Sequence, residues 1–197
     1  MVRLGGKIIL ASMVPAERKL MSSILQRAGY QITAETDSIR QALRKVRSLY
    51  CDLLIIDSGL DGGKGYKLAE IADQDRLAAV LMVTDTDVAY FHQEFAYIIK
   101  PISRENLIPA TKSVLWNWRR EEELRQRISH LENKLETRII VDKAKGILMD
   151  VQGWTEEQAH RYIQKEAMNQ GITARQMATL IVEKLGKNRA LLKKEEE

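Results

Sequence analysis

The chain has 197 residues, of which 45% are apolar and 29% are charged, and its formal net charge is +4. This length allows one ordinary domain and a smaller appendage. No apolar run is long enough to span a membrane and the start lacks a signal-peptide pattern, so we expect a cytoplasmic protein. The single cysteine, Cys51, excludes an internal disulfide and precedes an apolar run, which favours a buried structural thiol.

Residues 7–101 alternate between strand-like and helix-like segments, which is typical of a parallel α/β sheet. The third of the strand-like segments is continuously apolar, as expected of a strand that is buried on both faces. The five predicted strands are 7–11, 31–34, 52–57, 79–84 and 96–100.

The first predicted helix begins at Pro15, which suits a first helical turn, and reaches Gly29. We expect Leu20, Ile24 and Leu25 to face the core. The further predicted elements are a helix capped by Asp37 or Ser38, a loop over 59–65, a helix over 66–72 and a short helix near 88–95.

Three polar side chains fall at the predicted strand ends, namely Asp57, Thr84 and Lys100. Chemistry in parallel sheets gathers at the carboxyl ends of the strands. This arrangement resembles the receiver domains of bacterial response regulators, which implies a flavodoxin-like, five-stranded parallel fold. The resemblance makes Asp57 the phosphoacceptor, Thr84 and Tyr97 the switch residues, and Lys100 the phosphate-contacting lysine before a cis peptide bond.

Two neighbouring positions depart from the receiver pattern. Receivers carry an acidic pair after the first strand that holds Mg²⁺, whereas this chain has Ser12 and Met13 there. A hydroxyl and a thioether are poor Mg²⁺ ligands, so we expect no metal cofactor. We predict a pseudo-receiver that is controlled by a partner protein or by dimer geometry, with Asp57 and Lys100 as a residual polar pair. Phosphorylation by a sensor kinase is the alternative.

A long charged helix is predicted from Ser103 onward. Its apolar residues alternate four and three positions apart, as at the core positions of a short coiled coil. They are Leu124, Ile128, Leu131 and Leu135. We expect a homodimer through a connector over 103–137; the alternative is a helix that folds back on its own receiver-like domain.

Residues 138–187 read as three helices of about three turns each. The predicted buried positions of the first are Ile140, Ala144, Ile147, Leu148 and Val151; of the second, Ala159, Tyr162, Ile163 and Ala167; and of the third, Met177, Leu180, Ile181 and Leu185. Capping boxes are predicted at Thr155–Gln158 and Thr173–Gln176, and stops at Gly153, Gly171 and Gly186. Residues 188–197 would form a charged tail.

Long cations and thioethers lie away from the predicted buried positions of these helices. From Arg138 to Lys194 there are eleven Lys and Arg residues against six Asp and Glu, a net charge of +5. Such a face is either solvated or binds nucleic acid, and the spacing does not distinguish the two.

The run from Ala144 to Met149, the Glu156–Ala159 segment, Ala167-Met168 and Met177-Ala178 together resemble the ANTAR module, a three-helix RNA-binding domain of bacterial transcription antiterminators. The resemblance implies binding to hairpin loops in a nascent leader transcript. Unpaired loops expose base edges that an A-form stem hides. From the helix faces we predict that Lys143, Lys145, Arg161, Lys165 and Arg175 contact phosphates, and that Met149, Met168 and Gln176 lie near bases.

We therefore predict a dimeric RNA-binding antitermination regulator: a receiver-like domain over 1–102, the connector over 103–137 and the RNA-binding module over 138–187. The main rival is a DNA-binding response regulator, which would place a helix in the major groove. An enzyme is not indicated, because the three histidines are scattered over different elements. A protein-interaction adaptor is a further alternative.

Overall fold

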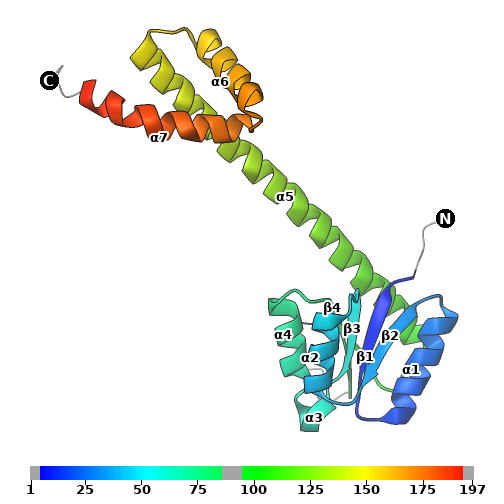
Figure 1. The fold of residues 1–197 in the computed structure, drawn as a ribbon. Helices are drawn as coiled ribbons and strands as arrows, with labels where there is room; N and C mark the ends of the chain where they lie inside the picture. Colours follow the sequence, from blue (N-terminus) through cyan, green and yellow to red (C-terminus); the bar gives the residue numbers. More distant parts are fainter. Residues whose placement is uncertain (1–4, 86–94, 193–197) are drawn as a thin grey trace. The chain divides into compact units, whose positions relative to one another are not determined.

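The computed structural model describes residues 5–85 and 95–192, with side chains as far as Leu185. A five-stranded parallel sheet in the order β2-β1-β3-β4-β5 forms the first part of the chain (Figure 1). Its strands are β1 Lys7–Ala11, β2 Gln31–Thr36, β3 Leu53–Asp57, β4 Ala79–Thr84 and β5 Tyr97–Ile99. This confirms the predicted flavodoxin-like fold.

Two hydrophobic clusters cover the two faces of the sheet, because the side chains of each strand alternate between them. On one face pack α1 Pro15–Arg27 and the first turns of α5 Arg104–Gln152. On the other face pack α2 Ile39–Ser48 and α4 Gly65–Gln74. Every residue of β3 is buried, as its apolar sequence predicts.

Several local predictions for the first part of the chain were wrong. Leu20 is 45% exposed, and Met21 takes the buried position instead because the inward face of α1 runs through Met21 and Leu25. β2 extends to Thr36, since Glu35 and Thr36 still pair with the end of β1. The predicted loop at 59–65 contains a short helix, α3 Leu60–Gly63. The predicted short helix near 88–95 lies largely outside the described residues.

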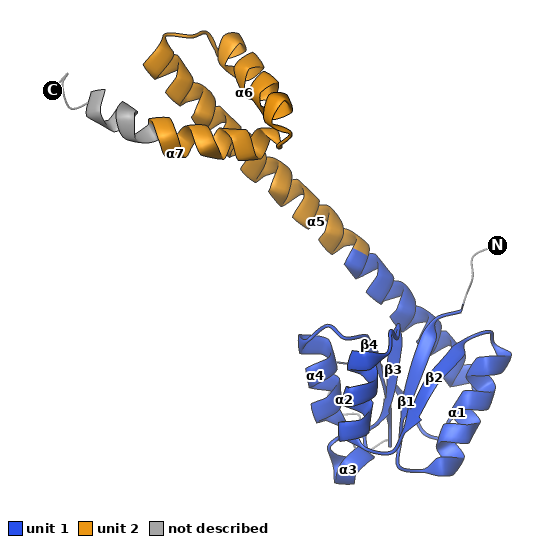
Figure 2. Cartoon of the chain, viewed as in Figure 1, with its two compact units in different colours: residues 1–122 blue, residues 123–197 orange. Residues whose placement is uncertain are grey.

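α5 is a single helix of 49 residues, so the connector and the first helix of the predicted module are continuous. The prediction of three separate short helices was therefore wrong for the first of them. The chain forms two compact units, residues 1–122 and 123–197, and α5 contributes to both (Figure 2).

The second unit packs the end of α5 against α6 Glu156–Gln170 and α7 Ala174–Leu192. Thr155 and Gln158 form the predicted reciprocal capping box, and Gly171 ends α6 in the left-handed conformation. Two predictions failed here. α7 does not stop at Gly186 but continues to Leu192. Tyr162 is 39% exposed, because it lies outside the buried cluster of the unit, with its ring edge-on against Trp154.

Candidate functional site

In the first unit, Ser12 and Lys100 meet around Asp57 in a polar pocket. This residue ends β3 and is only 3% exposed. One of its carboxylate oxygens accepts a hydrogen bond from the Gly59 N–H at 2.9 Å. The other accepts from the Ser12 hydroxyl at 3.0 Å and lies 3.2 Å from the Lys100 amine. Asp57 and Lys100 thus form a direct ion pair.

Glu17 is a member of this pocket that sequence reasoning missed. Its carboxylate lies 3.0 Å from the Lys100 amine and 3.4 Å from the Ser12 hydroxyl. The feature of the sequence that could have identified Glu17 is its place in the first turn of α1, because this helix begins just beyond the carboxyl end of β1. The Lys100 amine therefore bridges two carboxylates.

Burial and the contacts among Asp57, Glu17 and Lys100 together shift the pKa values of these three groups. Burial alone would raise the pKa of Asp57, but its hydrogen bonds and the charge of Lys100 outweigh burial and hold that pKa below its usual value. Burial, helped by the adjacent Asp57, raises the pKa of Glu17 against the effect of Lys100. Burial would lower the pKa of Lys100, but the two carboxylates raise it instead.

The residues around Asp57 do not fit a Mg²⁺ site, although receivers normally use this ion. Among the described residues, no group of three or more His, Cys, Asp or Glu side chains could hold a metal. The second carboxylate, Glu17, is already paired with Lys100, whose amine occupies the space between the two acids. Mg²⁺ demands several hard oxygen ligands in octahedral geometry.

Among the residues that the structure describes, no hydrogen bond joins the other predicted switch residues to the Asp57 carboxylate. Thr84 is fully buried, and its hydroxyl donates to the Asp85 carbonyl at 3.3 Å. Tyr97 lies on β5 with 41% of its surface exposed. The Lys100–Pro101 peptide bond is cis, as predicted. The backbone at Gly65 lies so close to Asp57 that only glycine fits, because a Cβ atom there would lie 2.3 Å from the Asp57 carbonyl oxygen.

The predicted dimer residues lie on the middle of α5. Leu124, Ile128, Leu131 and Leu135 are each between 51% and 60% exposed within one chain. Ile139 continues this apolar face and is 59% exposed. We call these five residues the α5 stripe. An apolar face of this length is unusual on a free helix surface.

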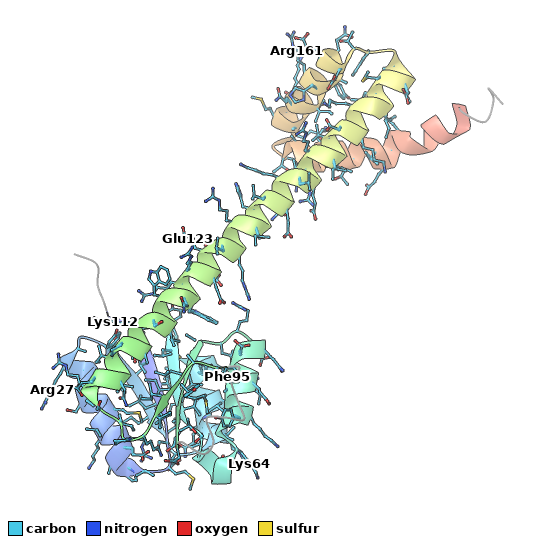
Figure 3. All side chains as sticks on the ribbon, turned by 180° about the vertical axis from the view of Figure 1, so that it is seen from behind. Arg27, Lys64, Phe95, Lys112, Glu123 and Arg161 are labelled. Atoms are coloured by element: carbon cyan, nitrogen blue, oxygen red, sulfur yellow. The ribbon has the colours of Figure 1, made fainter. Side chains whose placement is uncertain are left out.

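Three of the predicted RNA-binding residues share one exposed face of α6. They are Arg161, Lys165 and Met168, at spacings of four and three. Met168 is 83% exposed, which is unusual for an apolar side chain, and Arg161 lies on the surface of the unit (Figure 3). We call these residues the α6 strip.

Some of the other predicted RNA-binding residues already form ion pairs or hydrogen bonds within the second unit, and others do not. Lys145 on α5 is bound to Asp142 and Glu156, each at 2.7 Å. Arg175 at the start of α7 is bound to Glu136 at 2.7 Å.

The side chain of Gln176 accepts from the Thr173 N–H and so serves as part of the second capping box. Met149 on α5 is 39% exposed. Arg161 pairs with Glu157 one turn away, whereas no ion pair among the described residues engages Lys143 or Lys165. These last two are exposed cations available to a phosphate.

Two family models match the chain. The response regulator receiver domain matches residues 8–112 and the ANTAR domain matches residues 129–182. The chain is also similar to the transcriptional regulatory protein PdtaR of Mycobacterium tuberculosis, with 28% identity over 186 residues that cover 91% of each protein. A receiver domain joined to an ANTAR domain, together with the similarity to PdtaR, identifies this chain as a transcription regulator and not as an enzyme.

Solved receiver domains share the fold of the first unit. One from Methanospirillum hungatei is 23% identical, covers 59% of this chain and 98% of its own, and superposes with a TM-score of 0.52. The receiver domain of a putative Luxo repressor from Vibrio parahaemolyticus is 18% identical, with coverage of 61% and 98% and a TM-score of 0.53. Within the described residues, no helix is long and apolar enough to cross a membrane.

Proposed function

Because the chain belongs to the response regulator receiver family and carries an ANTAR domain, we propose that this transcription regulator is an antiterminator that binds hairpin loops in a nascent leader transcript. Binding would hold the transcript in a form that excludes the terminator hairpin. In this proposal residues 1–102 regulate, residues 103–137 connect and residues 138–187 bind RNA in the cytoplasm.

The observation that carries the proposal is the α6 strip within the region matched by the ANTAR domain. The buried faces of α5, α6 and α7 already satisfy the core of the unit, so packing does not explain why Arg161, Lys165 and Met168 share one face. Long cations suit phosphates, and an exposed thioether suits the flat face of an unpaired base.

The start of α7 argues against the rival, a DNA-reading helix. A recognition helix uses its first residues to reach base edges in the major groove. In this chain Arg175 is paired with Glu136 and Gln176 caps its own helix. Both polar side chains would have to leave intramolecular partners before they could read DNA.

Control by the first unit would not require phosphorylation. The Lys100 amine holds Asp57 and Glu17 together, so the negative charges of the pocket are partly neutralised without any added group. Phosphoryl transfer relies on positive charge to stabilise its transition state, and in receivers the metal ion supplies much of it. We propose that a partner protein or the geometry of a dimer sets the active state, with a sensor kinase as the alternative partner.

A phosphotransfer assay separates the two kinds of control. The full-length protein is incubated with a small phosphodonor and Mg²⁺, beside Asp57→Ala as the control. We expect no labelling above that of the Asp57→Ala variant. Clear labelling that depends on Asp57 would contradict control without phosphorylation.

Dimerisation would bring two RNA-binding modules together. The α5 stripe offers the apolar surface for a parallel or antiparallel pair of helices from two copies. Linking two weak hairpin contacts raises the overall affinity through effective concentration. A transcript with two tandem hairpins would therefore be the preferred ligand.

A binding competition tests the RNA proposal. Labelled RNA with two tandem small-loop hairpins is challenged by excess duplex DNA and by RNA with scrambled loops, at one fixed salt concentration. We expect the complex to survive both competitors and to be lost in Arg161→Ala with Lys165→Ala. The matched control is Lys19→Ala with Lys67→Ala, which removes two exposed cations from the first unit. Equal competition by duplex DNA would overturn the proposal.

A further inference from the structure

A groove of about 380 Å³ lies between the end of α5 and the start of α6, apart from the α6 strip. Its volume is comparable to that of the smaller ligand pockets in proteins, roughly 300 Å³ and upward. The lining residues are Arg138, Asp142, Lys145, Gly146, Met149 and Glu156. We call it the Gly146 groove.

Gly146 itself has no packing role. A Cβ atom added there would meet nothing within 4 Å among the described residues, its own helix backbone and chain neighbours aside. Yet glycine is, after proline, the least favourable residue in a helix interior. Its place inside the last two turns of α5 therefore costs stability without relieving a steric clash. A glycine of this kind is explained when a ligand must come close to the helix backbone.

The groove is not a phosphate site. The amine of Lys145 is bound to Asp142 and Glu156 at 2.7 Å each, and Arg138 lies 3.8 Å from Asp142. The two cations of the Gly146 groove are thus matched by two carboxylates, and the net charge of its lining residues is zero. A phosphate would meet carboxylate repulsion, unlike at Lys165 on the α6 strip.

The same lining suits the edge of an unpaired base. Carboxylate oxygens accept from the exocyclic amino group of a base, and an amine donates to a ring nitrogen or a carbonyl. Met149 is partly exposed in the groove and offers an apolar surface to the face of a base. The fixed Lys145 bridge holds both carboxylates in place before any ligand arrives.

We propose that the Gly146 groove receives one unpaired, amino-bearing base of the RNA loop, with Gly146 leaving the room for its close approach. This inference rests on the proposed RNA binding. It assigns base reading to a groove of α5 and α6, and leaves phosphate contact to the α6 strip.

The test uses a library of tandem RNA hairpins with randomised loops and the full-length protein. The wild type should enrich loops with adenine, cytosine or guanine at one position, and uracil placed there in the most enriched hairpin should weaken binding. Gly146→Gln fills the groove with a side chain that helices accept, and should weaken binding of that hairpin by about tenfold or more.

Two further readouts separate lost recognition from lost structure. Gly146→Ala should raise the thermal midpoint of the protein by about 2–4 °C, because alanine favours the helix, while still weakening the enriched hairpin. The dependence of binding on salt should be unchanged in both Gly146 variants, whereas Lys165→Ala should reduce its slope by about one. Ser129→Ala, an exposed helix position outside the groove, is the control and should bind normally.

The outcomes are distinguishable. If the wild type enriches no loop, the proposed RNA-binding function itself fails. If the wild type binds the enriched hairpin and Gly146→Gln binds it equally well, the groove proposal is overturned. Should Gly146→Gln fail to fold, Gly146→Ala decides: weaker binding by a more stable protein supports the proposal, and unchanged binding overturns it.

Discussion

Replacing Lys100 with methionine should destabilise the first unit and reveal the repulsion between two carboxylates. The amine lies 3.2 Å from Asp57 and 3.0 Å from Glu17, and its side chain is only 20% exposed. Removing one partner of a buried ion pair costs about 3–5 kcal/mol. Asp57 keeps its bonds from Ser12 and Gly59, so we expect a loss of about 2–3 kcal/mol at neutral pH.

The loss should depend on pH with a definite sign. In Lys100→Met the two acids face each other without a cation, so their folded-state pKa values should rise above the unfolded ones. A group whose pKa is raised in the folded state stabilises the protein at low pH, and this contribution to the free energy of unfolding is lost as the pH rises through the folded-state pKa. The difference in the free energy of unfolding between wild type and variant should therefore shrink as the pH falls from about 7 to about 5.

Native-state hydrogen exchange of the amides in β1 and β3 measures this loss, because core strands open only on global unfolding of their unit. Adding Glu17→Gln to Lys100→Met should recover about 1 kcal/mol, since one of the opposed charges is removed. The control is Lys67→Met, an exposed cation on α4, which should change stability by less than about 0.5 kcal/mol. A pH-independent loss below about 1 kcal/mol would refute the bridging role of Lys100.

Three further changes test the other parts of the account. Leu131, which is 57% exposed in one chain, belongs to the α5 stripe, and Leu131→Lys places a charge there. This variant should sediment as a monomer where the wild type sediments as a dimer, and a monomeric wild type would contradict the proposed dimer. Thr155→Ala removes the capping box of α6 and should cost the second unit about 1 kcal/mol in urea denaturation, so an unchanged midpoint would count against the cap. Gly65→Ala forces a Cβ atom against the Asp57 carbonyl and should cost about 1–3 kcal/mol or more, and full stability would show that the backbone relaxes freely.

The fold of the first unit could be predicted because its signals are local. Apolar runs mark the strands, and a parallel sheet brings Asp57 and Lys100 to one edge whatever the details of packing. Leu20 shows the limit of such reasoning. Met21 and Leu20 are both apolar neighbours in α1, and only the contact with the sheet decides which of them faces inward.

The sites were less predictable because their partners are distant in the sequence. Glu17 joins the pocket through a helix turn and not through the strand-end position where receivers carry their acids. The pair between Arg175 and Glu136 spans 39 positions and cannot be read from helix faces. The predicted boundary between residues 137 and 138 does not interrupt α5, because no glycine or proline separates the connector from the first helix of the module.

Single-round transcription in vitro tests the central claim most directly. The template carries a leader with two tandem hairpins that overlap an intrinsic terminator, and full-length transcript is measured as the protein is added. We expect read-through to rise with protein concentration, to stay at its basal level with Arg161→Ala plus Lys165→Ala, and to rise normally with the Lys19→Ala plus Lys67→Ala control. An unchanged fraction of terminated transcript, at protein concentrations that bind the leader RNA, would contradict antitermination.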